Sequence, residues 1–139
     1  MKIYQNKKLI HNFEGILQLF IGIGAFVSGI LMIIYPDGSL MELPLNMLHG
    51  SPFKNFLVPG ILLFSVNGLG NVFSAILSFK QHSIAGFAGI FFGFVLIVWL
   101  YVQVNMIGGG HWLQILYFIL GVIELSCGIL IREVVNERL

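Results

Sequence analysis

Four long apolar stretches, each bounded by a turn or by charged residues, make up most of the chain. They run over residues 13–35, 56–79, 84–106 and 112–131. The hydrocarbon core of a bilayer is about 30 Å thick, and a helix of roughly 20 apolar residues crosses it. Each stretch is long enough on its own. The sequence therefore predicts an all-α protein, a four-helix transmembrane bundle that forms a single domain over residues 1–139.

The balance of apolar and charged residues is typical of a chain that is surrounded by lipid. Apolar residues make up 58% of the sequence and charged residues only 9%, whereas about 25% of the residues in a soluble domain are charged. A surface of this kind is stable against lipid and aggregates in water. The few cations lie at the ends of segments and form no basic face, which argues against nucleic-acid binding. The bilayer is the expected partner.

The cations also predict an orientation, because Lys and Arg concentrate in cytoplasmic loops. Six of the seven precede the first stretch, separate the second from the third, or follow the fourth, and only Lys54 falls on the opposite side. The six are Lys2, Lys7, Lys8, Lys80, Arg132 and Arg138. We therefore expect a multi-pass protein with both termini in the cytoplasm.

The segment between the first two stretches, residues 38–55, is too apolar for a free aqueous loop. We expect it to lie on the membrane or to cover the outer end of the bundle. Pro59 follows it within the second stretch, and a proline inside a helix usually bends it. A bend under an apolar loop would open a cavity. The alternative is a proline that the helix simply tolerates, as membrane helices often do.

Polar residues and glycines recur at intervals of three and four residues in every stretch, which places them on one face of each helix. Polar groups in lipid are costly, so these faces should point into the bundle, and small residues there let helices approach closely. The four faces are Glu14, Gln18, Gly22, Ala25 and Gly29; Gly60, Phe64, Asn67, Asn71, Ser74 and Ser78; Gly86, Gly89, Gly93, Leu96, Leu100 and Gln103; and Gln114, Tyr117, Gly121, Glu124 and Gly128.

The rise of a helix converts these positions into depths. Glu124 lies about 18 Å below Trp112, past the middle of the membrane toward the cytoplasm. On the descending second stretch, Asn67 and Asn71 bracket the same depth. We expect an inner layer of Glu124 with the two asparagines. Gln103 and Gln114 should form an outer layer.

Glu124 is expected to be the only ionisable residue deep in a span, because Glu14 should sit hydrated at the cytoplasmic end. No Lys or Arg shares its depth, so we expect it to be neutral or hydrogen-bonded to the asparagine amides. It is either a proton-coupling or ligand-binding carboxyl, or a polar link between helices worth ~0.6–2 kcal/mol. The same two interpretations apply to Asn67 and Asn71.

Gln103 and Gln114 are likewise either ligand contacts or polar links between helices. For each of these amide side chains taken singly, a link between helices is favoured. Tyr117 is more often a packing residue than a ligand contact. The ligand-binding candidates are Glu124, Asn67, Asn71, Gln103, Gln114 and Tyr117.

Several chemistries find no support in the sequence. The four histidines lie at segment ends or in loops and predict no metal site. No Cys-x-x-Cys, Gly-x-Ser-x-Gly, His-Glu-x-x-His or phosphate-binding loop is present, so neither a catalytic residue nor a cofactor is predicted. Small multidrug exporters also have four spans and one membrane carboxyl. Their carboxyl lies in the first span, whereas here the deep acid is Glu124 and Glu14 is at the wrong depth, so that match is rejected.

Two stretches carry a resemblance. The first contains Leu43-Pro44-Leu45, the run from Ser51 to Gly60 and Asn67-Gly68, and the second contains Trp112-Leu113-Gln114, Tyr117-Phe118 and Gly121-x-x-Glu124-x-x-x-Gly128. Together they cover well under half of the chain. In this pattern the chain resembles a group of small, uncharacterised bacterial four-helix membrane proteins. The resemblance implies the fold and a bacterial cytoplasmic membrane, and it implies no activity.

Three hypotheses for function follow. The first is a protein that binds, or helps to move, a lipid or other apolar small molecule beneath the outer loop, with Glu124, Asn67 and Asn71 as polar contacts. The second is an accessory subunit whose glycine-rich faces pack against a membrane protein partner or against further copies of the chain. The third is a small intramembrane isomerase that uses Glu124 as acid or base. An enzyme is the least favoured, because no second acid–base group is evident.

Overall fold

A computed structural model describes residues 2–39, 52–107 and 112–136, with side chains over 7–39, 52–105 and 112–133. Helix α1 covers Lys2–Ile34. The second span consists of α2 (Leu57–Leu62), the π-helix η3 (Leu63–Leu69) and α3 (Gly70–Phe79), and it is followed by α4 (Ala85–Ile107) and α5 (Trp112–Asn136). No strand occurs in these ranges. The all-α prediction is confirmed.

Four of the described helical segments are long and apolar enough to cross a membrane. They are Lys7–Ile34, Leu57–Phe79, Ala85–Asn105 and Trp112–Glu133. Three of them match the predicted stretches within two residues at each end. The first begins at Lys7 rather than at residue 13, because α1 is already helical from Lys2. This earlier start brings the polar residues near its beginning inside the bundle.

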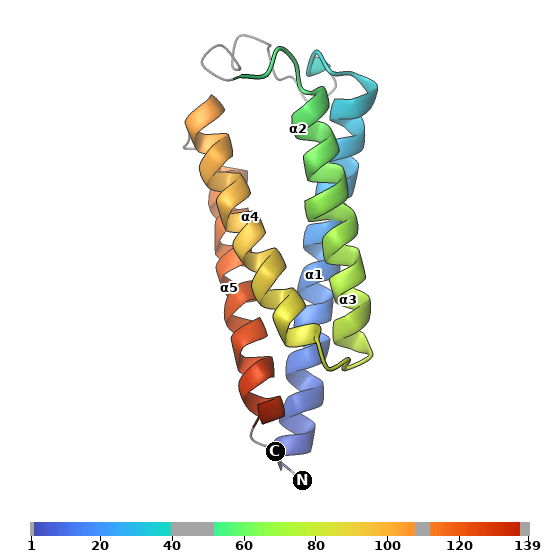
Figure 1. Ribbon diagram of the computed structural model, residues 1–139, viewed down its shortest axis with the longest axis vertical. Helices are drawn as coiled ribbons and strands as arrows, with labels where there is room; N and C mark the ends of the chain where they lie inside the picture. Colours follow the sequence, from blue (N-terminus) through green and yellow to red (C-terminus); the bar gives the residue numbers. More distant parts are fainter. Residues whose placement is uncertain (1, 40–51, 108–111, 137–139) are drawn as a thin grey trace.

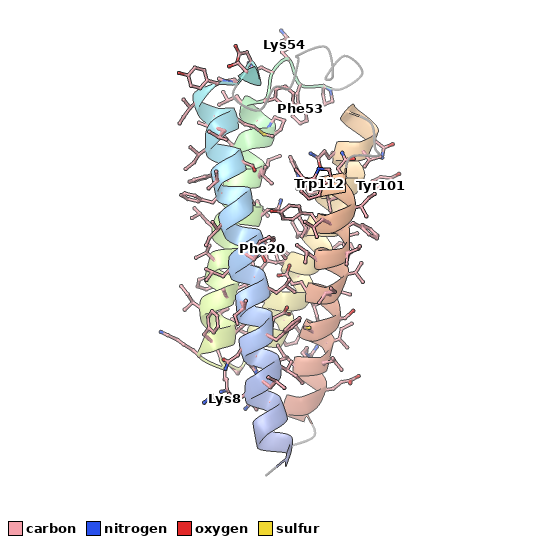
Figure 2. All side chains as sticks on the ribbon, turned by 180° about the vertical axis from the view of Figure 1, so that it is seen from behind. Lys8, Phe20, Phe53, Lys54, Tyr101 and Trp112 are labelled. Atoms are coloured by element: carbon pink, nitrogen blue, oxygen red, sulfur yellow. The ribbon has the colours of Figure 1, made fainter. Side chains whose placement is uncertain are left out.

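The helices form two pairs that join at one end of the molecule (Figure 1). Helix α1 packs along the whole second span, and α4 packs on α5. The two pairs meet where α1 contacts α5 and where α3 contacts α4. We call the end where α1 begins and α5 ends the terminal end, and the opposite end the loop end. Lys8 lies at the terminal end and Lys54 at the loop end, so the predicted separation of these cations is confirmed (Figure 2).

Glycines let the helices of each pair approach closely, as their position on the predicted faces indicated. A Cβ atom on Gly29 would lie 2.6 Å from the Phe64 backbone nitrogen, and one on Gly93 would lie 2.7 Å from the Leu125 nitrogen. Contacts this short leave no room for a side chain. The glycine faces are therefore used inside the bundle, within the α1 pair and within the α4–α5 pair.

The apolar core lies between the two pairs and at the loop end of the first pair. Leu17 and Ile21 of α1 meet Leu96 and Leu100 of α4, and Tyr117 packs beside them. A smaller cluster at the loop end joins Met32 to Phe56, with Phe53 and Leu63 against it. Many other large apolar side chains are exposed on the outer surface. That distribution is the one a lipid-facing bundle requires.

The second span begins close to the predicted position, but its irregular part does not lie at Pro59. Helix α2 starts at Leu57, whose backbone N–H donates to Oδ1 of Asn55 (3.0 Å). Pro59 falls in the first helical turn, where its missing N–H has no partner to lose. The irregularity lies beyond it, in η3, where the Gly70 N–H donates to the Ser65 carbonyl oxygen. A π-turn, and not the proline, interrupts this helix.

A tight turn ends α1 before Pro36, as the sequence predicted. Gly38 has a φ of 79°, a conformation that favours glycine, and the Phe56 N–H donates to the Pro36 carbonyl oxygen (2.8 Å). The Ser39 N–H donates to the exposed carboxylate of Asp37 (3.0 Å) and holds the pKa of that group below its usual value. Most of the apolar segment expected to lie on the membrane, residues 40–51, is outside the described residues.

Candidate functional site: a buried carboxyl pair

Eight polar side chains are buried in the described bundle, all at most 1% exposed. Three come from α1, four from the second span and one from α5. They are His11, Glu14, Gln18, Asn67, Asn71, Ser74, Ser78 and Glu124. Apart from His11, each lies on a face that the sequence predicted to point inward. Together they form the polar layer, which extends from His11 near the terminal end to Asn67 at about the middle of the second span.

Glu14 is completely buried, which corrects the expectation that it is hydrated. It lies about 10 Å along α1 from Lys7, where the apolar span begins. Its carboxyl packs against the backbone of α4: a Cβ atom on Gly89 would lie 2.5 Å from Oε2 of Glu14. The absence of a side chain at Gly89 therefore gives the carboxyl its place. The burial of Glu14 removes the depth argument against the small multidrug exporters, whereas the other argument, that Glu124 lies in the fourth span, still holds.

The carboxyl of Glu124 enters the same region from α5. Glu14 lies within its electrostatic field, and the Gln18 amide lies beside it. Neither carboxyl, however, has a hydrogen-bond partner among the described residues. The cation of α5 nearest in sequence, Arg132, is not available to them, because its guanidinium stacks on the Phe87 ring at 3.7 Å. The two acids thus lie in the bundle interior, near enough for their charges to interact, and of the described residues only the Gln18 amide lies beside one of them, without the geometry of a full hydrogen bond.

Gln18 connects α1 to α3 beside this pair. Its Nε2 donates to the Ser74 hydroxyl (2.8 Å), and its Oε1 accepts from the Ser78 hydroxyl (2.7 Å). Both serines lie on one face of α3, four residues apart. The amide is thereby fixed in orientation while it lies against Glu124. These three residues supply the ordered polar frame around the carboxyl pair.

His11 lies one turn before Glu14 on the same face of α1. Its Nδ1 donates to the Lys7 carbonyl oxygen (2.7 Å), since a carbonyl can only accept. Nε2 is buried without a partner among the described residues. Sequence reasoning placed this histidine at a segment end, because the first span was taken to begin after it.

Asn71 and Asn67 are buried on the predicted face of the second span, about one turn and about two turns, respectively, from Ser74 toward the loop end. The Asn71 Nδ2 donates to the Asn67 backbone carbonyl oxygen (2.9 Å). Both Oδ1 atoms lack a partner in the described chain. The contacts found for Glu124 are with Glu14 and Gln18 instead, so the inner layer contains partners that the depth argument did not name.

The other three predicted residues lie nearer the loop end and are half-buried: Gln103, Gln114 and Tyr117. The Tyr117 ring stacks on Phe20, with centroids 6.4 Å apart, and its hydroxyl lies against Gly24. Tyr117 therefore packs against α1, and a contact between Tyr117 and a ligand stays a prediction. The outer layer of Gln103 with Gln114 stays a prediction.

The signal for Glu14 and Gln18 was already in the sequence, because both belong to the predicted inward face of the first stretch. What failed was the predicted start of the first span, which set the depth assigned to Glu14. A span counted from residue 13 puts Glu14 at its edge, whereas a helix from Lys2 carries it well inside. The described residues hold no group of three or more His, Cys, Asp or Glu side chains placed to hold a metal ion.

No protein-family model, no curated protein and no solved structure matches this chain. The resemblance to small bacterial four-helix proteins stays a prediction, and the chemistry of the site has to be argued from its own geometry. Two buried carboxyls without partners can hold or release a proton, or accept hydrogen bonds from a bound molecule. The neighbouring amide and hydroxyls keep them in place.

Proposed function

We propose that this protein binds an apolar small molecule within the bundle, or helps to move one through the membrane, with the Glu14–Glu124 pair as its polar contact. The proposal rests on one observation: both carboxyls are fully buried, and neither is hydrogen-bonded within the described chain. The candidate ligands include lipids. The proposed location is a bacterial cytoplasmic membrane, with both termini in the cytoplasm.

The lack of partners argues against a purely structural role for Glu124. A polar group that links membrane helices does so through hydrogen bonds, which are worth on average about 0.6 kcal/mol each. Gln18 meets that description, since it bonds Ser74 and Ser78. Glu124 does so only weakly, because the Gln18 amide lies beside it but neither of its oxygens meets the geometry of a hydrogen bond within the described chain. Ionisable groups kept in membrane interiors at such a cost commonly mark ligand or proton pathways.

The two alternatives are affected differently by the geometry. The accessory-subunit hypothesis relied on glycine faces free to receive a partner, and the described glycines of those faces instead pack inside this bundle. The isomerase hypothesis lacked a second acid–base group, and Glu14 now supplies one beside Glu124. An isomerase would show turnover that disappears in both Glu14→Gln and Glu124→Gln.

Native mass spectrometry of the protein released from mild detergent tests the binding proposal. We expect a discrete additional mass on the chain, lost or reduced at least about tenfold in occupancy in Glu124→Gln and in Glu14→Gln. Glu133→Gln is the matched control, because it makes the same change at an exposed position of α5. A bare chain, or a chain retained only with another protein, would contradict the proposal and favour an accessory role.

A further inference from the structure

Two neighbours from α4 hold the side chain of Arg132 in place at the terminal end of α5. Its stem passes over Gly86, where a Cβ atom would lie 2.5 Å from Cγ of Arg132. Its guanidinium lies over the Phe87 ring, 3.7 Å from the ring centre. An aromatic face attracts a cation, and the glycine leaves room for the stem. The guanidinium therefore has a defined position on the surface of the bundle.

The stacked guanidinium keeps its hydrogen-bonding edge free. Stacking occupies one flat face of the group, whereas its five N–H donors lie in the plane and point outward from the rim. Within the described residues, no hydrogen bond or ion pair engages these donors. The adjacent acid, Glu133, is exposed, and consecutive residues of a helix do not face each other. Arg132 is thus a positioned cation with donors to offer.

Arg132 also lies at the level where hydrocarbon gives way to headgroups. The apolar part of α5 ends at Glu133 and that of α4 begins at Ala85, so the two spans share a boundary at the terminal end. The polar headgroups of a bilayer begin where such spans end. Lys8 and Lys80 are exposed at the same end, where Glu133 is the one exposed acid among the described residues. This excess of cations favours an anionic partner.

Helix α4 presents a row of three phenylalanine rings on the membrane side of this guanidinium. Phe87, Phe91 and Phe94 are spaced by four and three residues, which places them on one face of the helix. They are 54%, 58% and 58% exposed. Phe91 and Phe94 lie about 6 and 10 Å farther along the helix than Phe87. A hydrocarbon chain that enters the membrane at Arg132 can run along this phenylalanine row, whereas a soluble anion would leave it uncovered.

We propose that Arg132 and the phenylalanine row bind one phospholipid with an anionic headgroup, on the outside of the bundle and apart from the carboxyl pair. The guanidinium donates N–H groups to two phosphate oxygens, a fork geometry that arginine provides and lysine does not. One acyl chain lies along Phe91 and Phe94. A glycerol headgroup binds more tightly than choline, because choline would bring a positive charge toward the cations of this end.

Native mass spectrometry with added lipid tests this inference on the full-length protein. The delipidated protein in mild detergent is titrated with phosphatidylglycerol or with phosphatidylcholine of the same acyl chains, and the fraction carrying one lipid gives the affinity. We expect phosphatidylglycerol to bind at least about fivefold more tightly, the effect of one charge near a membrane surface. Glycerol 3-phosphate, which has the phosphate without the chains, should not be retained.

Variants assign the preference to Arg132. Arg132→Gln should abolish it, and Arg132→Lys, which keeps the charge but loses the fork, should retain only part of it. Phe87→Leu keeps the cation and removes the ring under it, so the affinity for phosphatidylglycerol should fall about two- to fivefold. Lys80→Gln is the matched control, because it removes one exposed cation at the same end, and it should keep the preference.

Equal affinity for the two lipids would overturn the inference. So would a loss in Lys80→Gln as large as that in Arg132→Gln, since the lipid would then respond to the total charge of this end and not to a fixed guanidinium. Retention of glycerol 3-phosphate as tight as that of the lipid would remove the role of the phenylalanine row. Where Arg132→Gln does not fold, Phe87→Leu and the comparison of the two lipids decide.

Discussion

At the scale of single residues, Gln18 is the side chain that binds the polar layer together. Its amide is hydrogen-bonded to two serines of α3, and it lies beside Glu124 of α5. It thus contacts the second and fourth spans from the first. A glutamine is suited to this because its amide donates and accepts at once.

Replacing Gln18 by leucine should lower the free energy of unfolding by about 1–2 kcal/mol, since two interhelical hydrogen bonds are lost. Ser78→Ala should cost about 0.6 kcal/mol alone and almost nothing once Gln18 is absent. Unfolding in mixed micelles, followed by circular dichroism, measures this. Ser65→Ala is the control, because that hydroxyl donates only to Ile61 of its own helix. Full additivity of Gln18→Leu and Ser78→Ala would contradict the hydrogen bond between them.

The facing carboxyls predict a second coupling. The effects of Glu14→Gln and Glu124→Gln on the unfolding free energy should differ from additivity by at least about 0.5 kcal/mol, because each acid changes the environment of the other. The same cycle built from Glu14→Gln and Glu133→Gln should be additive within about 0.5 kcal/mol. Additivity in both cycles would mean that Glu14 and Glu124 do not face each other in the membrane.

For single residues, the sequence predicted which helix faces point inward better than it predicted which side chains contact one another. Helical spacing alone placed Gln18, Asn67, Asn71 and Glu124 inward, and all four are buried. Partners depend on the relative height of two helices, and a shift of a few residues in the start of one helix changes them. The start of α1 was the weak point, because Lys7 and Lys8 look like the end of a span although the helix continues through them.

At the scale of helices, the close contact between α4 and α5 depends on glycines. Because a glycine has no side chain, the two backbones can approach closely at these positions. A Cβ atom on Gly128 would lie 2.6 Å from the Ile90 nitrogen and 2.9 Å from the Gly86 carbonyl oxygen. Both atoms are backbone, so the helices would have to move apart. At Gly121 the nearest atom is Cγ1 of Ile97, 3.2 Å away, which belongs to a side chain and has to move by only a few tenths of an ångström.

We therefore expect Gly128→Ala to lower the unfolding free energy by about 1–3 kcal/mol, as overpacking usually does. Gly121→Ala should be neutral or stabilising, since alanine favours a helix by up to about 1 kcal/mol over glycine. Thermal denaturation in detergent compares the two. An equal loss in both variants would show that the helices are not held together at Gly128.

The helices themselves were largely predictable, and the π-helix was not. Length and hydropathy indicate a span because the bilayer imposes both. Pro59 suggested a bend, but its position in the first turn of α2 makes it harmless. Helix η3 packs against α1, where Gly68 lies on the backbone of Phe26 and the Phe64 ring packs on the Phe26 ring. Such contacts leave no periodic signal in the sequence.

At the scale of the whole molecule, the arrangement of the termini gives a prediction for orientation. With Cys127 replaced by alanine, single cysteines at Lys8 and Lys80 should react with a membrane-impermeant maleimide only from the cytoplasmic side. A cysteine at Lys54 should react only from the outside, because six of the seven cations favour the cytoplasm. Labelling of intact cells and of inverted vesicles measures this. The reverse pattern would place the terminal end outside.

The backbone of α2 approaches those of α1 and η3 and, within the described chain, no other helix, and both views show the two pairs diverging toward the loop end (Figures 1 and 2). Most of the polar layer and the contacts between pairs lie at the other end. A change in the spacing of the two pairs at the loop end would therefore separate few helices of the described chain from one another. The same change at the terminal end would separate α1 from α5 and α3 from α4.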